Sequence, residues 1–495
     1  MIKYKNFKII IFFLIFILTS TFLLECNDQQ ATKEAGAVLP NISQIDKAID
    51  NGHLNKAKEL IRKIRCSQAD LPDTTEIALD FRLALITRIK LDFNKTEQDI
   101  RQELAKYYPD LNDSMLREWE RDDALEMRVI NGKKFYFHNA VSNLFRIDEE
   151  AKAVKTKVEG EKEDNLDQIK LEHTSEILDK IKESRKNRVE PVDMHIKYKL
   201  TVEPNVVPNG EIIRCWMPYP RTSRKRQKNI EFVSANVDDY IIAPEEYLQK
   251  TIYMEKKARQ DKPTVFKYEF KYTSMAEYYD LEKRSFPEYN EDSEIYKKYT
   301  AQNPPHIIFS DRIKKLTKSI VGEERAPYQK VKKIYEWIDQ NIPWASALEY
   351  STFRNIPAYV LDYRHGDCGM QTLLFITMTR YAGVPSKWQS GWMMHPGEVN
   401  LHDWAEVYYP EIGWVPVDQS FSLQNTESKD VNYYYTSGID SYRLIVNDAF
   451  TKEFFPQKIH PRSETIDFQR GEVEWRGGNI YFNEWDYYMA VEYLE

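Results

Sequence analysis

A cysteine, a histidine and an aspartate in the last third of the chain have the side chains that thiol chemistry requires. They are Cys368, His402 and Asp418. A thiolate attacks carbonyl carbon, a histidine takes the thiol proton and later protonates the leaving group, and a carboxylate orients the imidazole. We therefore expect an acyl-transfer site with Cys368 as nucleophile, His402 as its base and Asp418 as the residue that orients the histidine.

Cys368 stands where a helix is expected to begin. Gly366 and Asp367 precede it, and these residue types are common in loops and at helix N-caps. Residues 372–381 then follow an uninterrupted helical pattern that ends at 383–385, Gly-Val-Pro. A helix N-terminus offers unpaired N–H groups and partial positive charge, which favour a thiolate and can face an oxyanion. We therefore expect the helix to lower the pKa of the Cys368 thiol.

A β-hairpin is expected to carry the other two residues. Residues 401–408 and 414–418 have strand patterns, and turn residues lie between them. A loop of three or five residues places His402 directly opposite Asp418, and both loop lengths are common. Facing Cβ atoms lie about 5 Å apart, so the carboxylate can hold one imidazole nitrogen while the other faces the thiol. In this register Trp404 faces Pro416.

A metal site is the alternative interpretation of the same three residues. Their spacing matches no dense zinc motif, and no acidic loop has the spacing of calcium ligands. We expect neither a metal nor an organic cofactor.

Several short motifs in this region resemble a known family. In chain order they are Gly-Asp-Cys-Gly at 366–369, Ala-Gly-Val-Pro at 382–385, Ser-Gly at 390–391, His-Asp-Trp-Ala-Glu at 402–406 and Gly-Trp-Val-Pro-Val-Asp at 413–418. In order and spacing the region resembles the core of the transglutaminase-like superfamily, a branch of the papain-like folds often found in exported bacterial proteins. The resemblance implies a Cys-His-Asp triad, which maps onto Cys368, His402 and Asp418.

The resemblance has two further implications for the site. It implies a second oxyanion donor from a side chain ahead of the cysteine, for which Trp344 is the candidate. The chain departs from the family pattern after the aspartate, where Gln419 and Ser420 replace the usual proline followed by serine or threonine.

The rest of the chain divides by its hydrophobic periodicity, and we expect an α+β protein with a papain-like core. Polar and apolar residues largely alternate in 195–202, 211–217 and 265–272, which predicts a β-sandwich. The expected parts are an export segment (1–25), a helical region with a small helix-hairpin unit (36–150), a charged, solvated helical linker (151–190), the β-sandwich (191–275), the transglutaminase-like catalytic core (276–425) and a strand-rich C-terminal extension (426–495).

The N-terminus has the layout of an export signal. Three lysines precede the apolar run 9–24, which a polar stretch ends. A retained membrane anchor is the alternative, although 16 residues are slightly short for a span. Cys26 resembles a lipoprotein acceptor cysteine, but Glu25 stands where that pattern has a small residue. We expect a cell-envelope protein, either periplasmic or a membrane-anchored lipoprotein, that contacts the membrane only through this segment.

Composition limits the classes of partner. The formal net charge is −8, from 70 basic and 78 acidic residues, which does not favour a polyanion. A winged-helix outline near 95–148 would suggest DNA binding, but its charges are evenly mixed, and we expect no nucleic-acid partner. The expected substrate is a peptide or protein whose carboxamide or peptide bond is transferred to an amine or to water. The alternative is a non-catalytic, exported binding or assembly module with the same fold.

Overall fold

The computed structural model describes residues 41–67, 71–161 and 165–494, so the predicted export segment and Cys26 lie outside the described residues. None of the helices in these ranges is both long and apolar enough to span a membrane. The contacts divide the chain into two compact units. The first is built from the chain up to Thr87 together with Arg128–Lys134, and the second from Arg88–Met127 and Phe135–Glu495.

A helical hairpin makes up most of the first unit. It consists of α2 (Ile42–Asp50) and α3 (Leu54–Ser67), and α4 (Asp73–Asp92) follows. Asn41 caps α2 through a capping box with Gln44. Apolar residues at helical spacing are buried on both helices of the hairpin: Ile45, Ala48 and Ile49 on α2, and Leu54, Ala57 and Ile61 on α3.

Short helices and strands come next along the chain, and they belong to the second unit except for the parts within Arg128–Lys134. They are β1 (Phe93–Lys95), α5 (Glu97–Leu104), α6 (Asp113–Arg121), β2 (Met127–Ile130), β3 (Lys133–Phe137), α7 (Ala140–Ile147), α8 (Glu149–Glu159) and α9 (Asn165–Ser184). The charged stretch expected to be a solvated helix forms α8 and α9. One face of α9 is not solvated, because Ile177 and Leu178 are buried in the main core.

A β-sandwich follows, and the three alternating segments of the sequence lie in its strands β4 (Arg188–Val202), β5 (Ile212–Pro218) and β9 (Thr264–Tyr278). Its other strands in this part of the chain are β6 (Gln227–Ala235), β7 (Tyr240–Ile242) and β8 (Thr251–Lys257). One sheet has the order β13 (Gly438–Ile439), β9, β4 and β17 (Trp485–Leu494), with β6 also on β9. The other has the order β16 (Gly478–Ile480), β15 (Glu472–Trp475), β5, β8 and β7. The buried residues of both sheets form one apolar core.

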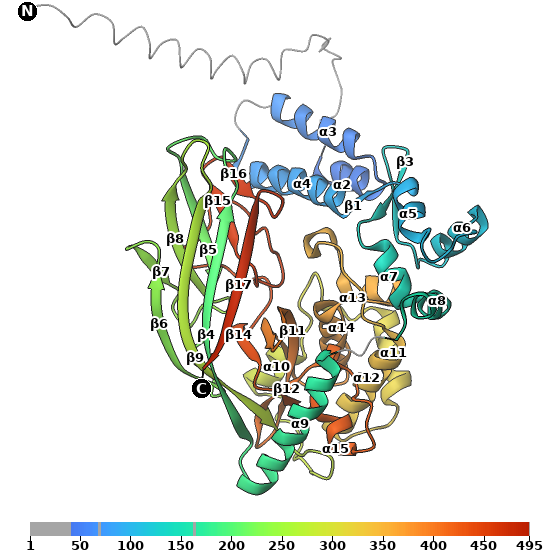
Figure 1. Ribbon diagram of the computed structural model, residues 1–495, viewed down its shortest axis with the longest axis vertical. Helices are drawn as coiled ribbons and strands as arrows, with labels where there is room; N and C mark the ends of the chain where they lie inside the picture. Colours follow the sequence, from blue (N-terminus) through green and yellow to red (C-terminus); the bar gives the residue numbers. More distant parts are fainter. Residues whose placement is uncertain (1–40, 68–70, 162–164, 495) are drawn as a thin grey trace, which may run out of the picture. The chain divides into compact units, whose positions relative to one another are not determined.

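The C-terminal strands complete both sheets of this sandwich. They are β13 (Gly438–Ile439), β15 (Glu472–Trp475), β16 (Gly478–Ile480) and β17 (Trp485–Leu494). Figure 1 shows β17, at the red end of the chain, lying along the green strand β4, and the pairing runs antiparallel over the whole of β17. Residues that lie far apart in the sequence therefore share one sheet.

The region expected to form the transglutaminase-like core combines helices with a second antiparallel sheet, which confirms the α+β class. Its helices are α10 (Glu294–Thr300), α11 (Asp311–Val321), α12 (Pro327–Asn341), α13 (Ile356–Tyr363), α14 (Cys368–Tyr381) and α15 (Lys429–Asn432), with 3₁₀ turns at Tyr350–Thr352, Gln419–Phe421 and Tyr434–Thr436. The sheet has the order β12-β11-β10-β14, formed by Gly413–Val417, Glu398–Tyr409, Ser386–His395 and Arg443–Asn447.

Helix α14 is the centre of this core. Every residue from Gly369 to Arg380 is buried, so the helix has no polar face of the kind that a surface helix presents. Its apolar side chains belong to one cluster with Ala405 and Val407 of β11 and with residues of α12 and α13. The packing of α14 therefore fixes its first residue beside β11, an inner strand of the sheet.

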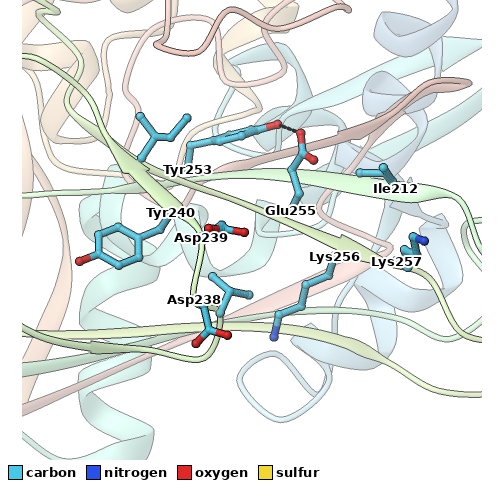
Figure 2. Close-up of a pocket in the computed structure, with 10 residues that line it drawn as sticks. Ile212, Asp238, Asp239, Tyr240, Tyr253, Glu255, Lys256 and Lys257 are labelled. Atoms are coloured by element: carbon cyan, nitrogen blue, oxygen red, sulfur yellow. Dashed lines mark hydrogen bonds between the residues drawn. The ribbon is translucent and has the colours of Figure 1, made fainter.

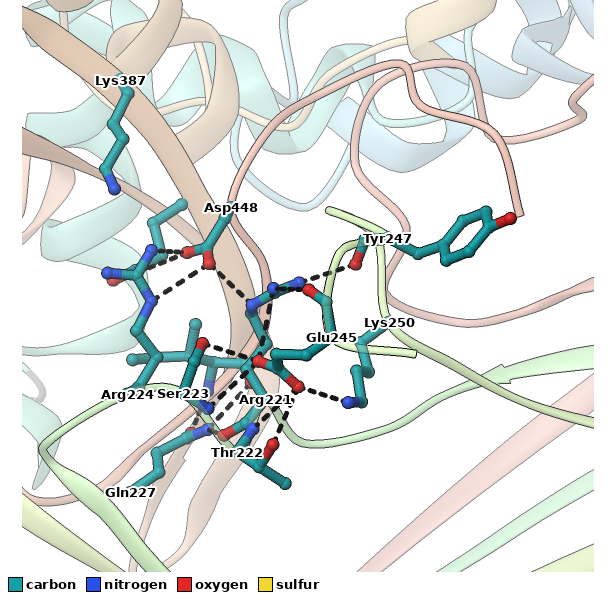
Figure 3. A network of polar contacts seen from close by, with 12 residues as sticks. Arg221, Thr222, Ser223, Arg224, Gln227, Glu245, Tyr247, Lys250, Lys387 and Asp448 are labelled. Atoms are coloured by element: carbon teal, nitrogen blue, oxygen red, sulfur yellow. Dashed lines mark hydrogen bonds and ion pairs between the residues drawn. The ribbon is translucent and has the colours of Figure 1, made fainter. Parts of the chain in front are cut away.

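A buried ionic network ties the sandwich to this sheet (Figure 3). Arg221 and Arg224 lie in the loop after β5, and both reach Asp448, which follows β14. The Arg221 Nε–Asp448 Oδ2 distance is 2.6 Å. Arg224 also lies 3.2 Å from Glu406 of β11, which pairs at 2.9 Å with Lys387 of β10. Removing one carboxylate would therefore leave buried cations without their partner.

Replacing Asp448 with alanine is expected to lower the free energy of unfolding by about 3 kcal/mol, because Arg221 and Arg224 would stay buried and lose the carboxylate that they share, keeping only their pairs with Glu245 and Glu406. The two arginines and Lys387 overcome the effect of burial and lower the pKa of Asp448. A carboxylate with a lowered pKa stabilises the fold fully above its unfolded value of about 3.9, and this contribution is lost as the pH falls through the lowered value.

Urea unfolding at pH 7 and at pH 3 measures both effects. The control is Asp292→Ala, which removes an ion pair to Lys297 from a side chain that is 96% exposed and should cost less than about 1 kcal/mol. Equal urea midpoints for the two variants at pH 7 would contradict the role given to Asp448.

Candidate active site

Cys368 is the first residue of α14, as the sequence predicts. Asp367 is the N-cap, and its Oδ1 accepts a hydrogen bond from the backbone N–H of Met370 at 3.1 Å. The aspartate side chain thereby satisfies one of the free N–H groups at the helix start. Cys368 lines a cavity of about 330 Å³ and is a free thiol. The other free thiol in the described residues, Cys215, is buried in β5.

The thiol of Cys368 contacts a carboxyl group. Its Sγ lies 3.5 Å from Oδ2 of Asp403, the residue after His402 in β11. Gln469 holds Asp403 in place, because its Nε2 donates to Asp403 Oδ1 at 2.7 Å and to the backbone oxygen of His402 at 2.8 Å. A glutamine 67 residues further along the chain therefore braces the strand that carries the histidine.

The expectation that the thiol pKa is lowered is wrong. Burial raises the pKa of Cys368 well above its ordinary value, and the carboxyl groups of Asp403 and Asp367 raise it further. Burial also raises the pKa of Asp367, to about 6, and that of Asp403 well above its usual range. The partial charge of a helix N-terminus is worth about 1 kcal/mol, which is too little to outweigh desolvation and two acidic neighbours. The resting thiol is therefore neutral.

Gly369 allows this close packing around the thiol. A Cβ atom at this position would lie 2.2 Å from the hydroxyl oxygen of Tyr350 and 2.7 Å from Oδ2 of Asp403. Tyr350 donates its hydroxyl proton to Oδ1 of Asp367. The glycine therefore provides the space that the tyrosine and the aspartate occupy beside the helix start.

The hairpin forms with a register that differs from the prediction by two residues. Glu406 faces Pro416 and Val407 faces Val415, and the connecting loop is 410–412. Continuing this register puts Asp418 opposite Trp404 and not opposite His402. A shift of two residues keeps every side chain on its face, so His402 and Asp418 remain diagonal neighbours on the same face.

His402 and Asp418 are joined directly. Nε2 of His402 lies 2.8 Å from Oδ2 of Asp418, and both side chains are buried. Burial would raise the pKa of Asp418, but His402 and Arg443 lower it below its ordinary value. Burial lowers the pKa of His402, and Arg443 adds to that effect while Asp418 opposes it. An ionised carboxylate beside a neutral imidazole is therefore the resting state of the pair.

The structure therefore forms two separate pairs, one between Cys368 and Asp403 and one between His402 and Asp418. Alternation along β11 places Asp403 with Ala405 and Val407, on the side that packs against α14, and His402 with Trp404. Among the residues that the structure describes, no hydrogen bond joins Sγ of Cys368 to the imidazole of His402.

Trp344, the predicted oxyanion donor, lines the same cavity as Cys368. Its backbone bridges to Gly366, two residues before the cysteine, and its side chain is 42% exposed. The guanidinium of Arg146 lies 4.6 Å from the centre of its ring. A cation on the ring face leaves the indole N–H free to point into the cavity.

Acidic residues that the sequence did not single out complete the cavity wall. They are Asp92, Glu349 and Asp467, and Arg470 lies among them with ion pairs to Glu349 and Glu464. Burial and the charge of Glu349 raise the pKa of Asp92 to about 8. No group of three His, Cys, Asp or Glu residues within the described part of the chain is arranged to hold a metal ion.

A second hollow, of about 1090 Å³, lies on the sandwich sheet that contains β5, β8 and β7 (Figure 2). Tyr240, Tyr253, Asp238 and Lys256 are among the residues that line it, and Figure 2 shows Tyr253 donating to Glu255. Neither a thiol nor an imidazole belongs to this lining, so we assign the chemistry to the cavity beside Cys368.

Replacing Asp403 with asparagine is expected to make the thiol more acidic, because the variant removes the carboxyl group that raises the pKa of Cys368. Alkylation of Cys368 by iodoacetamide at pH 8 should become at least about tenfold faster. Mass spectrometry of the Cys368 peptide measures the rate separately from the other cysteines.

The control is Asp486→Asn, an exposed carboxylate on β17. An unchanged alkylation rate in Asp403→Asn would show that this carboxyl group does not set the reactivity of the thiol.

Comparison with known proteins gives a family for this region. Residues 314–419 match the family model of the transglutaminase-like superfamily. An uncharacterized protein of Haemophilus influenzae is 24% identical over 274 residues, which cover 48% of this chain and 72% of that protein. The uncharacterized protein YebA of Bacillus subtilis is 24% identical over 161 residues, which cover 27% of this chain and 22% of YebA.

Two solved structures are similar in part. A candidate cysteine protease from Cytophaga hutchinsonii has a TM-score of 0.43 at 12% identity, covering 62% of this chain and 92% of that one. The periplasmic domain of TgpA from Pseudomonas aeruginosa has a TM-score of 0.25 at 13% identity, covering 50% of this chain and 91% of that one. The family match and the helix–sheet core together show that residues 314–419 are a transglutaminase-like domain, and that this chain carries the core of the transglutaminase-like superfamily.

Proposed function

We propose that this protein catalyses thiol-dependent acyl transfer on the carboxamide or peptide bonds of a peptide or protein. One observation carries the proposal. Cys368 lines the cavity where α14 begins, the carboxyl group that contacts its thiol belongs to Asp403 of β11, and the preceding residue of that strand, His402, forms a buried pair with Asp418. This arrangement supplies a nucleophile, a base and a carboxylate that orients the base.

The first half of the reaction acylates Cys368. In this structure the thiol contacts Asp403 and the imidazole of His402 lies on the other side of β11, so the reaction requires a rearrangement that brings the two together. His402 then takes the thiol proton as the sulfur attacks the carbonyl carbon. Because Nε2 of His402 is bound to Asp418, Nδ1 is the nitrogen that receives this proton. The tetrahedral intermediate then collapses, the carbon–nitrogen bond breaks, and the imidazolium gives its proton to the departing amine.

The oxyanion of this intermediate lies at the helix start. The backbone N–H groups at the first turn of α14 and the indole N–H of Trp344 are the proposed donors. The donation from Trp344 rests on its place in the cavity wall and on the free ring nitrogen beside Arg146.

The second half of the reaction resolves the thioester. Water attacks it in a peptidase or amidase, and a primary amine attacks it in a transglutaminase, with His402 removing the proton of the attacking group in both cases. We further propose that the reaction takes place in the cell envelope, on the basis of the export-type N-terminus alone.

Replacing Cys368 with alanine should abolish covalent trapping of an acyl group. Intact-mass spectrometry of the full chain, after incubation with a glutamine-containing peptide with and without a primary amine, should show a thioester on the wild type. The mass of the released product then distinguishes hydrolysis from transfer to the amine. Cys215→Ala is the matched control, because Cys215 is buried in the sandwich and should leave acylation unchanged.

Absence of a thioester in the wild type across glutamine, asparagine and peptide-bond substrates, with Cys368→Ala behaving identically, would favour the non-catalytic binding module.

Replacing Asp418 with asparagine should lower kcat/KM by about 10²- to 10⁴-fold, because an amide no longer favours the imidazole tautomer that leaves Nδ1 free to accept a proton. Steady-state kinetics on the substrate identified by mass spectrometry give this ratio. Ser420→Ala, which removes a weaker 3.4 Å contact to the same carboxylate, serves as the control. Equal activity of wild type and Asp418→Asn would remove Asp418 from the mechanism.

A further inference from the structure

A buried arginine shares the carboxylate of Asp418 with the histidine. Arg443 is the first residue of β14, and its side chain is completely buried. Its Nη2 lies 3.0 Å from Oδ2 of Asp418, and that same oxygen lies 2.8 Å from Nε2 of His402. One carboxylate oxygen therefore has two cation-forming partners.

A second acid and a second histidine extend the cluster. Nη2 of Arg443 lies 2.9 Å from Oδ2 of Asp440, and Oδ1 of Asp440 lies 3.2 Å from Nε2 of His395. The cluster therefore runs from His402 through Asp418, Arg443 and Asp440 to His395. Asp440 also accepts a hydrogen bond from Nε of Arg443 at 3.2 Å, so it holds the guanidinium through two nitrogens.

Phe421 shields the cluster. Its ring centre lies 3.9 Å from the Arg443 guanidinium and 4.9 Å from the ring centre of His402. An apolar ring at these distances excludes water and leaves the guanidinium to bind the carboxylates.

Other groups also face the cluster. The charged or chargeable ones are Lys170, over the ring of Phe421; His173 and Arg226, beside Asp440; and Asp403, which follows His402. Tyr335, Tyr434 and Tyr435 lie against it as well, and burial raises the pKa of each hydroxyl, so they remain neutral. Among the groups named, only His402 and Arg443 have an ion pair to the carboxylate of Asp418.

We propose that Arg443 is a positioning residue of the site, which holds the Asp418 carboxylate ionised and limits how strongly that carboxylate retains a proton on His402. The effect of Arg443 on catalysis rests on the proposed function, in which His402 is the base. With a neutral thiol at rest, a base that is also neutral at rest can accept the thiol proton. Burial chiefly keeps His402 in that form, and Arg443, which shares the Asp418 carboxylate, also lowers the pKa of His402.

The test is an NMR titration of the histidines in the full chain carrying Cys368→Ala, so that the thiol does not titrate. The chain has nine histidines, and loss of one signal in His402→Gln assigns the resonance. Because Arg443→Met alone leaves the buried Asp440 carboxylate without its arginine, with only His395 beside it, the informative comparison is Asp440→Asn against Asp440→Asn with Arg443→Met. These two variants differ only in the arginine, and circular dichroism confirms that each is folded.

Removal of the arginine is expected to raise the titration midpoint of His402 by about one pH unit, since a cation beside the shared carboxylate disappears. Arg443→Lys retains the charge and should keep the midpoint near that of the parent. Equal midpoints in the two Asp440→Asn proteins, or a lysine variant that behaves like methionine, would overturn the proposal.

Kinetics separate this inference from the proposed function. If His402 is the base, the acid limb of kcat/KM for the same variants with Cys368 restored should move upward by the shift that NMR measures. A shift seen by NMR without a matching shift of the acid limb would support the role of Arg443 on the imidazole and contradict the role of His402 as base.

Discussion

An ionised carboxylate buried away from water is the constraint around which the site is built. Asp418 is completely buried and keeps its charge only because His402 and Arg443 lie at its Oδ2. Each partner needs its own support, which is the hairpin for the histidine and Asp440 for the arginine. An unpaired charge in such a position would cost several kcal/mol, so the cluster is stable only when all of its members are in place.

Burial and neighbouring charges also set the protonation state of the thiol, but there they favour the neutral form. Cys368 is partly buried beside carboxyl groups, so its neutral form is favoured. A neutral thiol that contacts a carboxyl group, on the other side of β11 from a neutral imidazole, differs from a preformed thiolate–imidazolium pair.

Residues beyond the family match complete this centre. The match ends at residue 419, whereas Arg443 pairs with Asp418 and Gln469 braces Asp403 and the backbone of His402. Both come from the segment whose strands then enter the sandwich sheets. The extension is therefore part of the site as well as part of the sandwich, and a core truncated at residue 419 would lack the arginine and the glutamine.

Local patterns in the sequence were enough to place the start of α14 at Cys368, the strands of the hairpin and the alternation of the sandwich, because caps, turns and periodicity act between near neighbours. They also placed His402 and Asp418 on one face of the hairpin, although the predicted register was wrong by two residues. The face of a side chain depends on whether the register shifts by an odd or an even number of residues, whereas the register itself depends on where the loop lies. Only the tertiary structure decided that the thiol meets Asp403, that its pKa rises, and that Arg443 and Gln469 join the site. Those outcomes depend on burial and on contacts between residues tens of positions apart, which no local pattern encodes.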